Sequence, residues 1–226
     1  MAEPTLYRWP ESAAFGRRVP KSKFYDHGTV RPALRERFVA DILHVHWAYK
    51  LAESTVHLPG TTAIPEIQVF RIETKGDDIS DDLLTAIDRS VHFPIIYEIL
   101  SGERVRTVAA QKSLAGKAPR VGTYFTTDWF PSTADRRPLP TALDLPNLYE
   151  AILASLLPIQ RRAGESVHDA TERFDRVRRG QREIAALEKK LRNEPQLNRK
   201  IELRRQLKEC AATLAQLTDP APSNKE

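Results

Sequence analysis

The stretch WAYKLAESTVHLPGTTAIPEIQVFRI, residues 47–72, decides the fold of this chain. Its first residues continue a helical pattern, a Pro-Gly pair interrupts that pattern, and residues 64–72 have the composition and alternation of a strand. Because successive side chains of a strand point to opposite faces, Glu66 and Gln68 lie on the same face. The stretch therefore predicts a helix joined to a strand, with a carboxylate next to an amide on one side of that strand.

A helix is predicted immediately before this stretch. Apolar residues recur at three- and four-residue steps from Pro32 to Tyr49, and proline suits the first turn of a helix. His44 and His46 fall within this segment. Since residues two apart on a helix point to different faces, we do not expect these histidines to share a metal ion.

Helix and strand patterns follow the stretch in turn. Residues 81–91 predict a short helix that Ser80 can cap, and a helix beginning near Leu148 should stop near Pro158. Three strands are predicted between these helices, at residues 93–100, 104–111 and 121–130. The order of elements indicates an α+β fold whose sheet is mixed or antiparallel and is flanked by helices.

The end of the chain is a different kind of sequence. Apolar residues are spaced by seven from Ala170 to Leu191, and a second apolar series steps by four and three from Leu203 to Leu217. Pro195 separates the two series, and proline interrupts helical hydrogen bonding. Two long helices are therefore predicted, which can fold back as a hairpin, pair with a second chain in a homodimer, or form a kinked rod.

These patterns divide the chain into three parts. We expect an α+β body with an N-terminal arm at residues 1–160 and a basic helical hairpin or coiled coil at residues 161–218. Residues 219–226 contain two prolines and few apolar side chains, so a disordered end is expected there.

Positive charge is concentrated in the predicted hairpin. The formal net charge of the chain is +5. Residues 161–208 contain 15 Lys and Arg against 8 Asp and Glu, so this segment alone carries a surplus of seven and the rest is slightly negative. Such asymmetry favours a partner rich in phosphate or carboxylate, although a solvated helical face has the same composition.

Two groups of cations are candidate DNA contacts. In the arm, Lys21 and Lys23 adjoin two aromatic residues, so they can hold a phosphate backbone while a ring stacks on a base. The alternative is that the rings anchor the arm on the core and the lysines stay in water. In the hairpin, the candidate phosphate contacts are Arg176, Arg178, Arg179, Arg182, Lys189, Lys190 and Arg192.

Composition and missing motifs narrow the class of protein. The single cysteine, Cys210, sits at an apolar heptad position, and no apolar run reaches the roughly 20 residues of a membrane span. Signatures of P-loop, dinucleotide-binding and serine-hydrolase sites are not found. We therefore expect a cytoplasmic protein without a membrane segment, a resident cofactor or a metal site.

A series of ordered segments resembles a known family. The segments are PKSKFY (20–25), WAYKL with ST (47–55), EIQVF (66–70), LTAID (84–88), FPIIY (93–97), YFTTDW (124–129) and EPQLNRK (194–200). Over about residues 20–217 the chain is similar to the bacterial domain of unknown function 4391. The resemblance implies genes for a DEAD-box-type helicase and a DNA methyltransferase nearby, in restriction-like or phage-defence clusters. It supplies no catalytic residues.

Two functions follow from these observations. The favoured one is a non-enzymatic accessory subunit, whose helices bind a helicase or methyltransferase and whose cations contact DNA without sequence choice. The alternative is a metal-dependent nuclease with Mg²⁺ near Glu66 and Gln68, where Lys112 is a candidate for the lysine such a site often uses. The residues that could complete that site are Glu53, Asp88 and Glu98. Clustering of these side chains would favour the nuclease.

Overall fold

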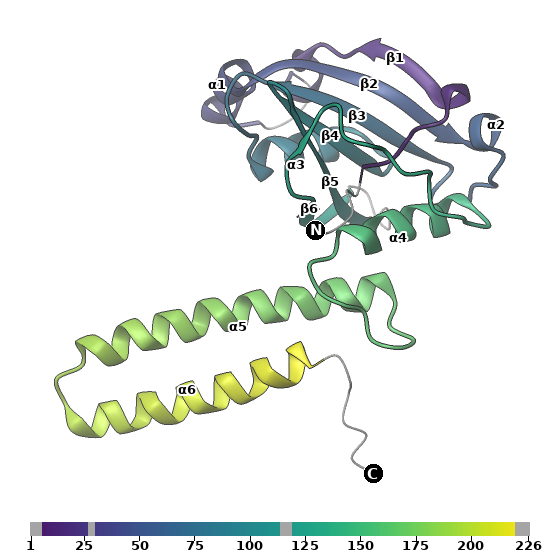
Figure 1. Ribbon diagram of the computed structural model, residues 1–226. Coiled ribbons are helices and arrows are strands. Elements are labelled where there is room, and N and C mark those ends of the chain that lie inside the picture. Colours follow the sequence, from purple (N-terminus) through teal and green to yellow (C-terminus); the bar gives the residue numbers. More distant parts are fainter. Residues whose placement is uncertain (1–5, 27–29, 114–118, 220–226) are drawn as a thin grey trace. The chain divides into compact units, whose positions relative to one another are not determined.

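The computed structural model describes residues 6–26, 30–113 and 119–219 (Figure 1). The chain divides into two compact units, the body (residues 1–157) and the tail (residues 158–226). The body contains a seven-stranded sheet with helices, and the tail contains two long helices that form a hairpin. The predicted fold class, an α+β fold with a mixed or antiparallel sheet and a C-terminal helical hairpin or coiled coil, is confirmed: the sheet is mostly antiparallel and the two helices form a hairpin.

The strands of the body pair in the order β1-β2-β3-β4-β5-β6, and β7 pairs with β5. Their bounds are β1 Ala14–Arg18, β2 Ile42–Ala52, β3 Glu66–Thr74, β4 Ile95–Ser101, β5 Arg104–Ser113, β6 Arg120–Thr126 and β7 Phe130–Pro131. β3 and β4 are parallel because helix α3, Asp81–Ser90, carries the chain back to the same edge, whereas the other described pairs are antiparallel. The turn between β4 and β5 uses Gly102 at φ +57°, where a side chain would be strained.

One face of the sheet packs against α3. Phe70 of β3, Tyr97 of β4 and Ile87 of α3 belong to one buried apolar cluster, which also includes Phe38 of α1. The remaining helices of the body are the 3₁₀ turns η1 Glu11–Ala13 and η2 Lys21–Phe24, and α1 Pro32–Asp41, α2 Glu53–Val56 and α4 Leu145–Leu156.

The opposite face of the sheet is buried as well. Ile67, Val69 and Ile96, which alternate with the residues of the α3 cluster, are almost fully buried. Helix α4 lies against β3, β5 and β6, and its Tyr149 hydroxyl donates a hydrogen bond to the carbonyl of Ala110 in β5. Strands covered on both faces explain why the β4 sequence is almost continuously apolar.

The prediction of one helix from Pro32 to Tyr49 is wrong in its second half. Helix α1 ends at Asp41, and residues 42–52 form β2, which pairs with nine residues of β3. Ile42, Val45, Trp47 and Tyr49 of this segment are β-branched or aromatic, and pairing with β3 outweighs their helix-like spacing. The stretch quoted at the outset therefore joins two antiparallel strands through α2, and does not join a helix to a strand.

Three smaller predictions are also corrected. The N-terminal arm, for which the sequence analysis predicts no strand, contributes edge strand β1. Ser80 stands at the N-cap of α3 but its side chain makes no capping bond, and its hydroxyl instead accepts a hydrogen bond from Arg37 (2.7 Å). The strand expected at residues 121–130 is two strands, β6 and β7, separated by a segment whose Thr127 amide bonds to Thr107 of β5.

The tail folds back on itself near Pro195, which is the hairpin among the three arrangements that the sequence left open. Helices α5, Val167–Asn193, and α6, Leu197–Thr218, lie side by side and antiparallel (Figure 1). A Cβ built on Gly180 of α5 would lie 3.6 Å from Leu214 Cδ1 of α6, so the helices approach closely there. The kinked rod is therefore wrong, while pairing of tails between two chains stays a prediction.

The expected disordered end lies almost entirely outside the described residues. Asp219 itself is described and follows α6 as its C-cap. Among the helices that the structure describes, none has the length and apolarity to cross a membrane.

Candidate functional site

The body holds a buried ion pair between α3 and β5. Lys112 Nζ lies 3.3 Å from Asp88 Oδ1, and the two side chains are 1% and 4% exposed. The ammonium group also donates to the carbonyl oxygens of Val91 and Phe93, which lead into β4. The lysine thus fastens the crossover between α3 and β4 to the neighbouring strand β5.

Two tyrosines complete the environment of Asp88. The hydroxyls of Tyr97 and Tyr124 donate to Asp88 Oδ2 at 2.9 and 2.6 Å. Burial raises the pKa of both phenols, so they stay protonated and act as donors. Burial also raises the pKa of Asp88 and lowers the pKa of Lys112; the attraction between the two opposes both shifts, and the tyrosine bonds oppose that of Asp88. The cluster is saturated with internal partners, which fits a structural role.

Glu66 and Gln68 form a second polar group. Gln68 Nε2 donates to Glu66 Oε1 at 2.6 Å, and Lys50 Nζ of β2 lies 2.8 Å from Glu66 Oε2. Gln68 is directly opposite Lys50 in the pairing of β2 with β3. The prediction that Glu66 and Gln68 share one strand face is confirmed, and Lys50 is the unforeseen partner of the carboxylate.

The residues of the nuclease hypothesis fall into separate networks. Within the described chain, no hydrogen bond or ion pair connects the Glu66–Gln68–Lys50 group with the Lys112–Asp88 cluster. Glu53 lies exposed in α2. Over the described residues, no group of three or more His, Cys, Asp or Glu side chains is arranged to hold a metal ion.

Glu98 belongs to a third network on the other face of the sheet. Its carboxylate, 1% exposed, accepts bonds from Arg71 (2.7 Å) and Trp9 (2.8 Å) and also from Arg136. Burial favours the neutral acid, but the two arginines outweigh it, so the pKa of Glu98 is lowered. Glu98 therefore anchors the N-terminal segment and the loop after β7 to the centre of the sheet.

The two histidines lie together because their segment is a strand. His44 and His46 share one side of β2, and their ring centroids are 6.1 Å apart. The expectation that they point to different faces is wrong for this reason. His44 Nδ1 is already 2.8 Å from Arg18 of β1, which gives this nitrogen a partner within the sheet.

The lysines of the arm differ in their surroundings. Lys21 Nζ donates to the carbonyl of Ile42 at 2.8 Å, and partial burial together with nearby cations lowers its pKa. Lys23 is exposed, while its neighbour Phe24 is 4% exposed and packs in the α3 cluster. The Phe24 ring thus anchors the arm and is not available for stacking on a base, which leaves Lys23 as the accessible cation.

The seven cations proposed to contact DNA in the tail are all exposed residues of α5. Arg178 lies over the ring of Phe174, with its guanidinium carbon 5.9 Å from the ring centre. Carboxylates lie at helical spacing from several of the seven, among them Asp175 and Glu183. Lys and Arg nevertheless outnumber Asp and Glu on α5, so the helix carries a net positive charge that is available to an external anion.

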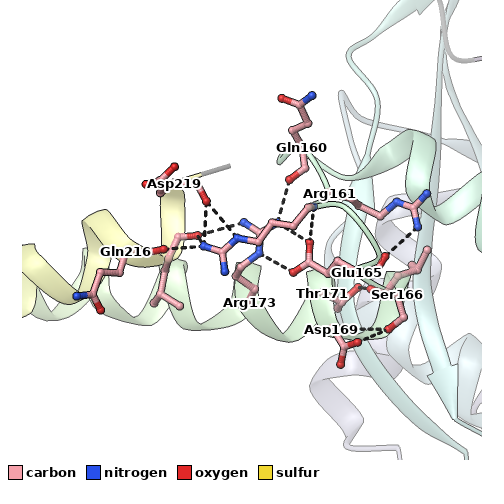
Figure 2. A network of polar contacts seen from close by, with 12 residues as sticks. Gln160, Arg161, Glu165, Ser166, Asp169, Thr171, Arg173, Gln216 and Asp219 are labelled. Carbon is pink, nitrogen blue, oxygen red and sulfur yellow. Dashed lines mark hydrogen bonds and ion pairs between the residues drawn. The ribbon is translucent and has the colours of Figure 1, made fainter. Parts of the chain in front are cut away.

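A polar network fastens the open end of the hairpin (Figure 2). Arg173 of α5, 3% exposed, makes a two-pronged ion pair with Glu165 at 2.7 and 2.8 Å. The same guanidinium donates to the carbonyls of Gln160 and of Leu217, the latter in the last turn of α6. Arg162 donates to the carbonyls of Gln216 and Asp219. Two cations thus satisfy carbonyl groups at the C-terminal end of α6, where the helix dipole favours positive charge.

The fold and these sites define a sheet protein with a basic helical hairpin. The chain belongs to the family described as domain of unknown function DUF4391, whose model matches residues 8–214. No curated protein and no solved structure matches the chain. The family resemblance inferred from the ordered segments is confirmed.

Several polar partners were missed at the level of sequence. Lys50 was hidden because its segment was assigned to a helix, whereas strand alternation would have placed it on the Glu66 face. Asp88 accepts hydrogen bonds from Tyr97 and Tyr124, and Glu98 accepts one from Arg136. These partners are distant in sequence, so local spacing does not predict the contacts.

Proposed function

We propose that this protein is a cytoplasmic accessory subunit of a bacterial restriction-like or phage-defence system. In this role the tail binds a helicase or a DNA methyltransferase, and the cations of α5 hold DNA through its phosphates. The observation that carries the proposal is the surplus of exposed cations on α5, which contains eight Lys and Arg against five Asp and Glu, with seven of the eight cations exposed. Such contacts provide affinity without sequence preference.

The second helix of the tail supports the protein-binding part of the proposal. None of the described residues of α6 is fully buried, although its apolar residues recur at heptad spacing. Leu197 and Ile201, at its N-terminal end, are 70% and 58% exposed. Apolar side chains left partly uncovered by the hairpin are suited to contact a partner protein.

Charge reversal tests the DNA contact. Glutamates in place of Arg178, Arg179 and Arg182 should weaken binding of duplex DNA more than tenfold at low salt. They should also lower the slope of log K against log salt by roughly two to three, since each phosphate contact contributes about 0.9. Binding is measured by fluorescence anisotropy over a series of salt concentrations.

The control for this experiment changes the net charge equally in the body. Reversing Arg17, Arg35 and Arg104, which are exposed and lie outside α5, should have a much smaller effect. Equal losses in both variants would indicate a general charge effect, and unchanged affinity in the α5 variant would remove DNA from the role of the tail.

Affinity purification tests the protein partner. The tagged chain is isolated from its native cell with and without nuclease treatment, and co-purifying proteins are identified by mass spectrometry. A helicase or methyltransferase that remains bound after nuclease treatment, and is lost when residues 158–226 are removed, supports an adaptor that works through the tail. Recovery of the protein alone would contradict it.

The metal-dependent nuclease remains the alternative proposal. Its support is the shared face of Glu66 and Gln68, while the pairing of Glu66 with Lys50 and the separate pairing of Lys112 with Asp88 weaken it. Cleavage of DNA in Mg²⁺ or Mn²⁺ that is abolished by Glu66→Ala would support this alternative, and no cleavage by the intact protein would exclude it under those conditions.

A further inference from the structure

A groove of about 860 Å³ lies between α1, α3 and η2 in the body. This volume is within the range of sites that bind small molecules. Four cations line the groove, against a single carboxylate from Asp82, and they come from three different elements. The cations are Lys23, Arg31, Arg37 and Arg89.

Three of these cations have no competing partner. Arg37 is engaged by Asp41, Ser80 and Asp82, the last at 3.8 Å. In the described chain, no hydrogen bond or ion pair is formed by the side chains of Lys23, Arg31 or Arg89, all of which are exposed. Like charges gathered in one concave surface repel each other unless an anion binds between them.

The walls of the groove provide apolar contact beside the cations. Val30 and Leu34 are half-buried, Ala33 is exposed, and all three form part of the lining. A single phosphate ion would occupy only a small part of the volume. The combination suits a ligand with a compact anionic group and an organic part that lies against apolar side chains.

The first turn of α1 adds to the positive field. Arg31 is the N-cap of this ten-residue helix and its side chain supplies no acceptor to the first peptide N–H groups. The positive end of the helix dipole is therefore directed to the same region as the Arg31 guanidinium.

We propose that this groove binds an organic phosphate, with the phosphate group held by Arg31, Arg89 and Lys23. Guanidinium groups match phosphate oxygens in two-pronged geometry, and a phosphate concentrates its charge on one centre, as several converging cations require. The organic part lies against Val30, Ala33 and Leu34, the apolar side chains of the lining that keep accessible surface. The phosphate belongs either to a free nucleotide or to the backbone of a nucleic acid strand, and the test distinguishes these sources.

At its floor the groove adjoins the buried Asp88 cluster. Thr85 lines the groove and precedes Asp88 by three residues on helix α3. A ligand seated over Thr85 would therefore lie within one helical turn of the cluster that fastens α3 to β5. Binding should raise the melting temperature of the body because the ligand adds its binding free energy to the folded state.

The test uses isothermal titration of the full chain with ADP, adenosine, inorganic phosphate and a 5′-phosphorylated oligothymidine. ADP or the oligonucleotide should bind with a measurable affinity, and adenosine should not. Arg31→Gln and Arg89→Gln should each weaken the binding about tenfold or more, because each removes charged hydrogen bonds to phosphate. Arg35→Gln is the matched control, since Arg35 is an exposed arginine of α1 outside the groove.

The outcomes separate the two phosphate sources and the two proposals. Binding of ADP identifies a free nucleotide site, while binding of the oligonucleotide alone, weakened by the groove variants, identifies a strand-binding site. The α5 charge-reversal variant should retain this binding, since the groove lies in the body. The proposal is overturned if neither ligand binds, or if binding is unaffected by the Arg31 and Arg89 substitutions.

Discussion

Replacement of Arg173 by methionine should destabilise the hairpin of the tail. The side chain is 3% exposed and forms a two-pronged ion pair with Glu165, together with bonds to the carbonyls of Leu217 and Gln160. Methionine keeps the length of the side chain and removes all of its donors. The Glu165 carboxylate, 10% exposed, then remains without its cation.

The size of the effect follows from these contacts. Removing one partner of a buried ion pair costs about 3–5 kcal/mol, because the remaining charge is left unpaired away from water. Arg162 still contacts the end of α6, so the loss should fall at the lower limit, about 3 kcal/mol. For a unit of this size, that loss corresponds to a decrease of about 12–24 °C in melting temperature.

Two spectroscopic signals separate the tail from the body in this experiment. The three tryptophans, at positions 9, 47 and 129, all lie in the body and report its unfolding by fluorescence. Circular dichroism at 222 nm reports the long helices. The transition of the dichroism signal should move to lower temperature in Arg173→Met.

Two further variants make the experiment decisive. Arg179→Met, at an exposed position of the same helix, should change stability by no more than about 0.5 kcal/mol. Glu165→Gln combined with Arg173→Met should cost less than the sum of the single changes, because the two side chains interact directly. An Arg173→Met protein that melts like the wild type, or strictly additive effects, would refute the assigned role of this ion pair.

Three other predictions concern stability. Hydrogen bonds from Arg173 lower the pKa of Glu165 from 4.5 to about 2, so ionised Glu165 stabilises the tail above pH 4.5 and this contribution is lost as pH falls toward 2. In Glu165→Gln, the melting temperature followed by circular dichroism should therefore depend less on pH between 4.5 and 2. The same pH dependence in both proteins would contradict this prediction. Gly180→Ala should raise the urea midpoint by the equivalent of about 0.5–1 kcal/mol, since its Cβ meets Leu214 at an ordinary distance of 3.6 Å, and a decrease would indicate overpacking. Lys112→Met should lower the free energy of unfolding of the body by about 3 kcal/mol, measured by denaturation followed through tryptophan fluorescence. Adding Asp88→Asn should recover part of this loss. Unchanged stability in the Lys112→Met protein would show that the ion pair does not contribute.

Elements that depend on residues close in sequence were predicted correctly, whereas strand β2, which depends on distant residues, was not. The tail was foreseen because heptad spacing and Pro195 are local signals, and helices need no distant partner to satisfy their backbone hydrogen bonds. Helix α4 was foreseen for the same reason, including its end before Pro158. These elements depend on residues three or four positions apart.

Strand β2 shows the opposite case. Residues 42–49 fit a helical period as well as a strand, and only pairing with β3 and β1 decides between them. For residues 42–49 that pairing joins positions twenty or more apart, which local spacing does not encode. Because this segment was assigned to a helix, Lys50 was not predicted as the partner of Glu66, and His44 and His46 were predicted to lie on different faces.

The anionic-ligand groove could not have been foreseen from spacing alone. Lys23, Arg31 and Arg89 come from three elements, and each is an ordinary exposed cation in its own segment. They become a site only because Phe24 anchors the arm beside α3 and because α3 must cross over the sheet to make β4 parallel to β3. The charge count directed attention to the tail, where cations are consecutive in sequence. The body has fewer cations, but several of them line one groove. A small phosphorylated ligand needs cations that surround one site, and a high number of cations along one segment does not provide that.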